Sequence, residues 1–321
     1  MAAIPSHFTL NNGKRMPSVG LGCWMGSAGG GQRVYDMCTT AIELGYRHFD
    51  TASGYGNEAE VGRAIKDSIA KGIPRSEIFL TTKLGGDNHG NVQGALQASL
   101  AALFGDESDP NIRYVDLYLM HWPQGETLSP EADPTFVDTW KAMERLSTDQ
   151  VKSIGVSNFS IKNLDILLPH CSVIPVTNQV ELHPCLPQND LKEYCEHENR
   201  KILLTAYSPL GNGASFMDHP AITTAAKELG DVTPAQIALS WGVTRGTAVV
   251  PKSENPGRLR ANLALITLSD GDMKAIDALH QTPGMHKSLL HFHAKDGSGV
   301  FGWTYEQLGW NMVAGGIVPT N

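Results

Sequence analysis

The chain has 321 residues, of which 41% are hydrophobic, and its formal net charge is −8. These values suit a globular protein with a large core, and the acidic balance argues against nucleic-acid binding, which needs clustered lysine and arginine. The first eight residues lack the pattern of a signal peptide and no run is apolar enough to span a bilayer, so we expect a cytoplasmic protein without a membrane partner.

In chain order, the first expected element is a hairpin, with strands at 8–10 and 14–16 around a turn at 11–13. Eight short apolar runs follow, separated by amphipathic stretches. The expected strands cover residues 19–22, 48–50, 78–82, 115–120, 153–156, 176–180, 203–207 and 248–250. The expected helices include residues 34–44, 57–70, 91–103, 136–146 and 188–197, and another that begins with a capping box at 233–236.

Strands that alternate with helices form a parallel sheet, and eight such units predict an α/β fold, the (β/α)8 TIM barrel. The sequence has no evident linker or repeat, so residues 1–321 are expected to form a single domain. The segment from about residue 281 onward is less regular, and we expect it to lie over the barrel mouth. The five cysteines include no CxxC pair, which favours reduced thiols over a disulfide framework or a structural zinc site.

Four ionisable residues each lie at or just past the end of a separate expected strand: Asp50, Tyr55, Lys83 and His121. The ends of parallel strands converge on one face of a barrel. Taken singly, each residue is more often structural, but together they can form an acid–base device. At an effective dielectric constant of about 20, an ammonium about 4 Å from a phenolate stabilises it by roughly 4 kcal/mol. We therefore expect Lys83 to lower the pKa of Tyr55 toward neutrality and Asp50 to keep Lys83 charged.

In their contexts, residues 50–58 (DTASGYGNE), 78–83 (IFLTTK) and 115–123 (VDLYLMHWP), these four residues resemble the catalytic tetrad of the aldo-keto reductases. That family consists of NAD(P)H-dependent carbonyl reductases on a (β/α)8 barrel, and the resemblance covers roughly residues 7 to 270. The resemblance implies a reversible reduction of aldehydes or ketones in which Tyr55 is the general acid. This reaction requires no metal.

The resemblance also implies a nicotinamide site. Ser157, Asn158 and Gln179 match residues that bind the carboxamide, and Tyr207 matches the aromatic residue on which the nicotinamide ring stacks. Lys252 and Arg258 match the pair that clamps the adenosine 2′-phosphate, which favours NADPH over NADH. The remaining positions that the resemblance assigns to the cofactor are Ser208, Leu210, Ser253 and Asn262.

Three departures from the family pattern affect the cofactor. Glu254 follows the clamp serine, and its carboxylate would repel a 2′-phosphate, so NADH remains an alternative. Ala261 replaces a polar residue that often contacts the adenine. The segment 212–220 is short for a loop that straps the cofactor down, which predicts faster release. A glycine-rich stretch at 20–31 does not have the spacing of a dinucleotide-binding loop, and we interpret it as a loop beside the active site.

The resemblance implies a small carbonyl substrate, such as an aldehyde, a ketone or a sugar, without identifying it. The expected pocket residues are Trp24, Trp122 and Trp303. Two alternatives to a reductase stand beside this reading. One is a non-catalytic, NADPH-binding regulatory or redox-sensing relative on the same barrel. The other is a hydrolase or isomerase that uses Asp50 and His121. The protein is expected to be a monomer or a dimer.

Overall fold

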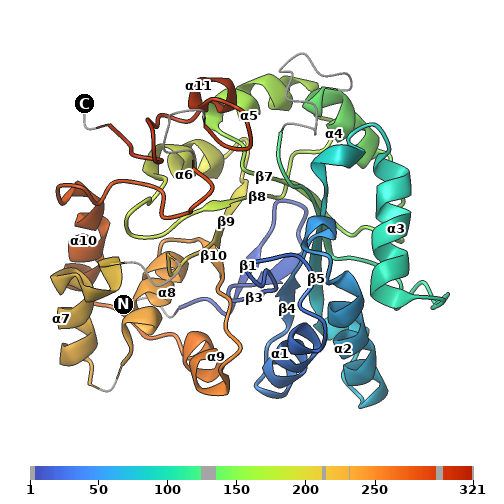
Figure 1. The fold of residues 1–321 in the computed structure, drawn as a ribbon, viewed down its shortest axis with the longest axis horizontal. Helices are drawn as coiled ribbons and strands as arrows, with labels where there is room; N and C mark the ends of the chain where they lie inside the picture. Colours follow the sequence, from blue (N-terminus) through green and yellow to red (C-terminus); the bar gives the residue numbers. More distant parts are fainter. Residues whose placement is uncertain (1–3, 124–134, 212–214, 231, 294–298, 320–321) are drawn as a thin grey trace.

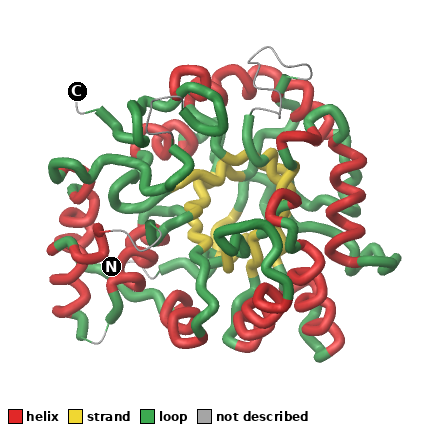
Figure 2. The backbone as a smooth tube through the Cα atoms, viewed as in Figure 1, coloured by secondary structure: helices red, strands yellow, loops and turns green. Residues whose placement is uncertain are grey.

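The computed structural model describes residues 4–123, 135–211, 215–230, 232–293 and 299–319. Eight parallel strands lie at the centre of the molecule and helices surround them (Figures 1 and 2). The strands are β3 (Leu21–Gly22), β4 (His48–Asp50), β5 (Phe79–Leu84), β6 (Leu117–Met120), β7 (Ile154–Ser157), β8 (Thr177–Glu181), β9 (Leu203–Tyr207) and β10 (Ala248–Val250). Each strand pairs with the next one along the chain, and the predicted (β/α)8 barrel is confirmed.

The barrel closes where the chain before β3 meets β10. Val19 forms a parallel bridge with Val249, and the Gly20 N–H donates to the Val249 carbonyl at 2.8 Å. The expected strand at 19–22 therefore pairs on both sides. Ser18, Gly20 and Gly22 form hydrogen bonds with Val249 and Pro251, while Leu21 and Gly22 pair with β4. Gly22 is required here, since a Cβ would lie 2.7 Å from the Val250 carbonyl oxygen.

The predicted N-terminal hairpin is also present, as β1 (His7–Thr9) paired antiparallel with β2 (Arg15–Pro17). The α-helices are α1 (Gln32–Glu43), α2 (Glu58–Ala70), α3 (Val92–Phe104), α4 (Phe136–Glu144), α5 (Ile161–Leu167), α6 (Asn189–Glu196), α7 (Pro220–Glu228), α8 (Pro234–Thr244), α9 (Pro256–Leu263), α10 (Asp270–Asp277) and α11 (Tyr305–Leu308). Short 3₁₀ turns include η1 (Ser53–Tyr55) and η5 (Ser215–Asp218). The expected helix ends are correct to within two residues.

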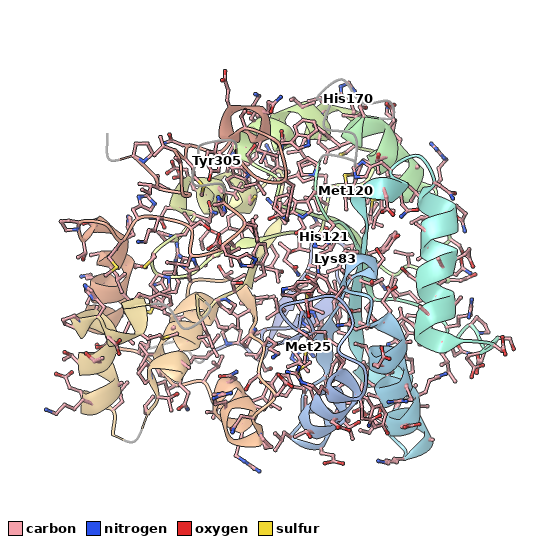
Figure 3. The ribbon with its side chains drawn as sticks, in the orientation of Figure 1. Met25, Lys83, Met120, His121, His170 and Tyr305 are labelled. Atoms are coloured by element: carbon pink, nitrogen blue, oxygen red, sulfur yellow. The ribbon has the colours of Figure 1, made fainter. Side chains whose placement is uncertain are left out.

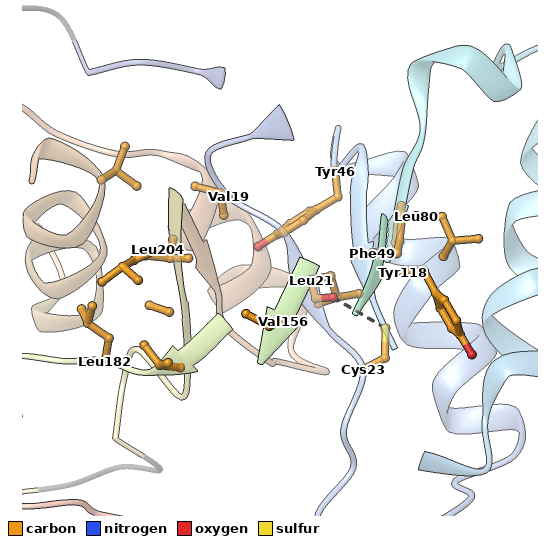
Figure 4. Packing of buried hydrophobic residues seen from close by; sticks show 14 of the residues in the cluster. Val19, Leu21, Cys23, Tyr46, Phe49, Leu80, Tyr118, Val156, Leu182 and Leu204 are labelled. Atoms are coloured by element: carbon orange, nitrogen blue, oxygen red, sulfur yellow. Dashed lines mark hydrogen bonds between the residues drawn. The ribbon is translucent and has the colours of Figure 1, made fainter. Parts of the chain in front are cut away.

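The core is continuous between the barrel strands and the inner faces of the helices. Figure 4 shows Leu21, Phe49, Leu80 and Val156 packed together within it, and all four are fully buried. Strands β4, β5, β6, β7, β8 and β10 are buried along their whole length, as expected for a parallel sheet that helices cover. The five cysteines are free thiols, as predicted. Among the residues described, no helix is long and apolar enough to cross a membrane.

A cavity of about 730 Å³ opens at the hairpin end of the barrel. Its lining includes Arg15, Arg47 and Phe79, which stand on the hairpin and at the amino ends of the strands. The four predicted catalytic residues lie at or just past the carboxyl ends of the strands instead. The cavity is therefore separate from the candidate site.

Two buried histidines should make the folded protein less stable in acid. Burial lowers the pKa of both His48 and His89 to about 4, whereas an unfolded histidine titrates near about 6.5. Below that value the unfolded chain binds protons that the folded chain does not, so the free energy of unfolding should fall as the pH drops from about 6.5 to about 4. Each histidine contributes a loss of up to about 3 kcal/mol.

Urea unfolding at several pH values checks this expectation in the wild-type protein and in His48→Gln and His89→Gln variants. Each variant should lose less stability on acidification than the wild type does. Parallel pH curves for all three proteins would contradict the assignment.

Candidate active site

The four residues of the predicted tetrad come together at the carboxyl end of the barrel. Lys83 Nζ donates to Asp50 Oδ1 at 2.6 Å and to the Thr51 carbonyl at 2.9 Å, and it lies 3.5 Å from the Tyr55 hydroxyl. The Tyr55 and His121 rings meet edge to face, with their centroids 5.7 Å apart. Figure 3 shows Lys83 and His121 next to each other at the centre of the molecule. The expected convergence of strand ends thus places an ammonium between a carboxylate and a phenol.

Local structure fixes each of these side chains. Asp50 and Lys83 lie within β4 and β5, and Lys83 is fully buried. Tyr55 ends the 3₁₀ turn η1, whose Ser53 hydroxyl donates to the Lys83 carbonyl at 2.9 Å. Asn57 was expected only as a helix start, yet it is buried and its amide donates to the Cys23 carbonyl at 2.8 Å. This contact ties the turn that carries Tyr55 to the end of the first barrel strand.

The expected direction of the Tyr55 pKa shift is wrong. Burial of the phenol is the largest influence and raises its pKa above the ordinary value, although the positive charge of Lys83 lowers it. The sequence argument counted the ammonium but not the loss of solvent around the phenol. Tyr55 is therefore protonated at neutral pH, which is the state that a proton donor needs.

The surroundings of Lys83 and His121 also decide the protonation states of these two residues. Burial disfavours the charged form of Lys83, but Asp50 and Tyr55 outweigh it and raise the pKa of the ammonium. Burial, with a further contribution from Lys83, lowers the pKa of His121 to about 3. Lys83 is therefore positive and His121 neutral at physiological pH. A neutral imidazole can donate one hydrogen bond without adding charge to the site.

The residues assigned to the carboxamide form a connected set next to the tetrad. Gln179 Nε2 donates to Asp50 Oδ2 at 2.7 Å, and the Ser157 hydroxyl donates to the Gln179 carbonyl at 2.7 Å. Asn158 Nδ2 donates to the His121 carbonyl at 3.0 Å, and the Tyr207 hydroxyl donates to Asn158 Oδ1 at 2.9 Å. The direct bond between Gln179 and Asp50 was not expected from the sequence, and it links this set to the tetrad.

Two residues of the same region have a positive φ, a backbone conformation that residues other than glycine seldom adopt. Asn158 follows β7 with φ 65°, and Ser208 follows β9 with φ 48°. Asparagine tolerates the left-handed region, whereas serine does so less readily. Such strain concentrates at ligand-binding sites, and both positions were assigned to the cofactor. Leu210, three residues after Tyr207, is half-buried.

The tryptophans assigned to the substrate pocket occupy different surroundings. Trp24 is 40% exposed and its ring centroid lies 5.1 Å from that of Tyr55. Trp122 meets Phe292 and Phe301 edge to face. Trp303 is only 7% exposed and packs with Val300 and Leu308 under this aromatic group, so its surroundings favour a supporting role over a wall of the pocket.

A buried carboxylate holds the C-terminal segment against the barrel. Glu181, at the end of β8, accepts hydrogen bonds from the Ser288 hydroxyl at 2.6 Å, the Leu289 N–H at 2.8 Å and His183 Nε2 at 2.8 Å. Burial opposes the charge of Glu181, but these hydrogen bonds prevail and lower its pKa. The predicted position of the segment over the barrel mouth is supported by these contacts and by those of Trp122. Residues 124–134, 212–214 and 294–298 lie outside the part of the chain that the structure describes.

The residues assigned to the adenosine phosphate surround the start of α9. Lys252 and Arg258 are exposed there, and Arg258 Nε donates to the Ser253 hydroxyl at 3.2 Å. Two cations at a helix N-terminus fit a phosphate group, because the terminal N–H groups favour negative charge as well. Asn262 is 2% exposed, so an adenine could reach it only at the edge of its side chain.

An arginine that sequence reasoning missed also lies at this end. Arg33 donates from Nε and from a terminal nitrogen to the two carboxylate oxygens of Glu254, each at 2.9 Å, and Lys252 donates to the same carboxylate at 2.6 Å. These contacts, with that of Arg33 foremost, lower the pKa of Glu254 to about 2. The sequence offered no signal for this pair, because its members stand on α1 and before α9.

Comparison with known proteins adds relatives over most of the chain. The model of the aldo/keto reductase family matches residues 18–281. A glycerol 2-dehydrogenase (NADP⁺) of Saccharomyces cerevisiae is 39% identical over 88% of this chain and 93% of its own length. A D-galacturonate reductase of Hypocrea jecorina is 40% identical over 85% and 90%, and an aldehyde reductase of S. cerevisiae is 41% identical over 86% and 91%.

Solved structures give the same picture. An aldo/keto reductase from Brucella melitensis is similar with a TM-score of 0.74 and 38% identity, over 86% of this chain and 100% of that chain. An aldo-keto reductase of the silkworm Bombyx mori is similar with a TM-score of 0.77 and 32% identity, over 87% and 88%.

Proposed function

Because the chain belongs to the aldo-keto reductase family, we propose that it reduces an aldehyde or ketone to the corresponding alcohol with NADPH, in a reversible reaction. The observation that carries this proposal is the position of Lys83, buried between the Asp50 carboxylate and the Tyr55 hydroxyl. A hydrolase or isomerase built on Asp50 and His121 would leave that arrangement, and the cations at the start of α9, without a purpose.

The reaction needs a hydride at the carbonyl carbon and a proton at the carbonyl oxygen. When bound, NADPH supplies the hydride. Tyr55 donates its proton to the oxygen as negative charge develops there, and the Lys83 ammonium stabilises the phenolate that remains. Asp50 keeps Lys83 charged and in place through a 2.6 Å hydrogen bond. Neutral His121 donates a hydrogen bond that orients the carbonyl oxygen, and solvent then returns a proton to Tyr55.

The proposed cofactor site extends from the tetrad to α9. Ser157, Asn158 and Gln179 would bind the carboxamide, while the ring of Tyr207 would support the nicotinamide. The 2′-phosphate would lie between Lys252 and Arg258. Ser208, Leu210, Ser253 and Asn262 would complete the site. We propose Trp24 and Trp122 as the walls of the substrate pocket, with Trp303 behind them.

The names of the relatives suggest where to look for substrates. One acts on glycerol, one on D-galacturonate and one on aldehydes. We therefore propose a polar carbonyl compound, such as dihydroxyacetone, a sugar acid with a free aldehyde or a short aldehyde. We further propose that residues 1–321 form one domain that works in the cytoplasm as a monomer or a dimer.

A binding titration followed by an assay tests the proposal. Quenching of tryptophan fluorescence would give the Kd for NADPH and for NADH, and loss of nicotinamide absorbance would report turnover with the three substrate types. We expect binding of NADPH and carbonyl-dependent oxidation. Binding without turnover on any carbonyl would favour the non-catalytic reading, and binding of neither nucleotide would overturn the proposal.

A further inference from the structure

Glu254 presents an electrostatic problem for the proposed NADPH site. Its carboxylate is ionised and hydrogen-bonded to Lys252, one of the two cations proposed for the 2′-phosphate. If Lys252 were its only partner, the Glu254 carboxylate would compete with the phosphate for the Lys252 ammonium. The carboxylate would also repel the phosphate. An NADPH site of this composition needs another group that takes up the negative charge.

Arg33 is in position to do so. It approaches the carboxylate with two parallel N–H groups, so that Oε2 is bound by Arg33 and Oε1 is shared between Arg33 and Lys252. A bidentate pair of this kind fixes both the charge and the orientation of the carboxylate. Helices α1 and α9 are in contact, and Figure 1 shows them side by side, so the scaffold holds Arg33 near Glu254.

Resting on the proposed function, we propose that Arg33 is a specificity-determining residue that secures the preference for NADPH by holding Glu254 while Lys252 turns to the 2′-phosphate. Without a phosphate, Lys252 shares Glu254 with Arg33. With a phosphate, Arg33 keeps the carboxylate by both oxygens, and Lys252 and Arg258 face the ligand as unopposed cations. NADH carries a neutral hydroxyl at the same position, so its affinity does not depend on the release of Lys252 from Glu254.

A double-mutant cycle measures the coupling between the two residues. The proteins are the wild type, Arg33→Gln, Glu254→Gln and the double variant, and the readout is the Kd for NADPH and for NADH from tryptophan fluorescence quenching. Arg33→Gln should weaken NADPH binding by about fivefold, the effect of losing one exposed ion pair, and leave NADH binding within about twofold. In the Glu254→Gln background, the same Arg33 substitution should change NADPH binding by less than about twofold.

Arg63→Gln is the matched control. Arg63 is an exposed arginine on the neighbouring helix α2 and binds Gln32, so its replacement removes one nearby positive charge without touching Glu254. Equal losses of NADPH affinity for Arg33→Gln in both backgrounds would overturn the inference, because they would indicate a direct phosphate contact or long-range attraction. A loss below about twofold with Glu254 present would also overturn it. Failure of the wild type to bind either nucleotide would instead overturn the proposed function.

Discussion

A Tyr55→Phe variant is expected to lose about 10²- to 10⁴-fold in carbonyl turnover while its Kd for NADPH stays within about twofold. The substitution removes the proton donor but keeps the ring, whose centroid lies 5.1 Å from that of Trp24 and 5.7 Å from that of His121. Because the hydroxyl lies 3.5 Å from Lys83, its loss should cost little stability. Single-turnover measurements of nicotinamide oxidation, with fluorescence titration of NADPH, separate the chemical step from binding.

Tyr194→Phe is a suitable control for the loss of a hydroxyl. Tyr194 lies on α6 and donates to Asp165 at 2.6 Å, away from the tetrad. That variant should retain full turnover. If Tyr55→Phe turned over carbonyl compounds at nearly the wild-type rate, Tyr55 could not be the proton donor, and another acid would have to be sought.

A Lys83→Met variant is expected to lose both turnover and stability. Lys83 is fully buried and its ammonium is 2.6 Å from Asp50, so methionine would leave a buried carboxylate with only Gln179 as its hydrogen-bond donor among these side chains. Loss of one partner of a buried ion pair costs about 3–5 kcal/mol. Turnover should fall as well, because no positive charge would then stabilise the Tyr55 phenolate.

Chemical unfolding of the variant beside a Lys192→Met control measures this cost. Lys192 forms an i,i+4 ion pair with Glu196 on α6, and the two side chains are 17% and 47% exposed, so water still reaches the pair. Solvent-accessible i,i+4 pairs contribute about 1 kcal/mol or less. A similar change in unfolding free energy for the two variants would show that the buried pair has no special structural weight. Loss of stability with intact turnover would remove Lys83 from the proposed mechanism.

The sequence predicted the arrangement of the tetrad because short apolar runs mark the strands, and the residues at the ends of these runs stand in contexts that resemble a known family. Asp50, Lys83 and His121 each follow an apolar run, and parallel pairing in register brings such ends to one face. The barrel itself followed from eight alternating units. The position of the C-terminal segment could only be guessed, because it depends on Ser288 reaching the buried Glu181.

Other features depend on distances and solvent exclusion that residue order does not contain. The upward pKa shift of Tyr55 results from burial of its phenol, which outweighs the opposite effect of the Lys83 ammonium. The pairing of Arg33 with Glu254 joins a helix and a loop from opposite ends of the barrel sequence. The hydrogen bond from Gln179 to Asp50 crosses the barrel in the same way. No pattern of residues in the sequence indicates any of these three features.

Closure of the barrel by Val19 and Val249 bears on how the protein folds during synthesis. As the chain leaves the ribosome, β3 to β9 emerge before β10, so the incomplete sheet carries two open edges. Open edges readily pair with other chains, and contacts between residues so distant in sequence form slowly. The nascent chain is therefore exposed to aggregation until β10 has emerged and paired, and this is the stage at which a chaperone would have its greatest effect on yield.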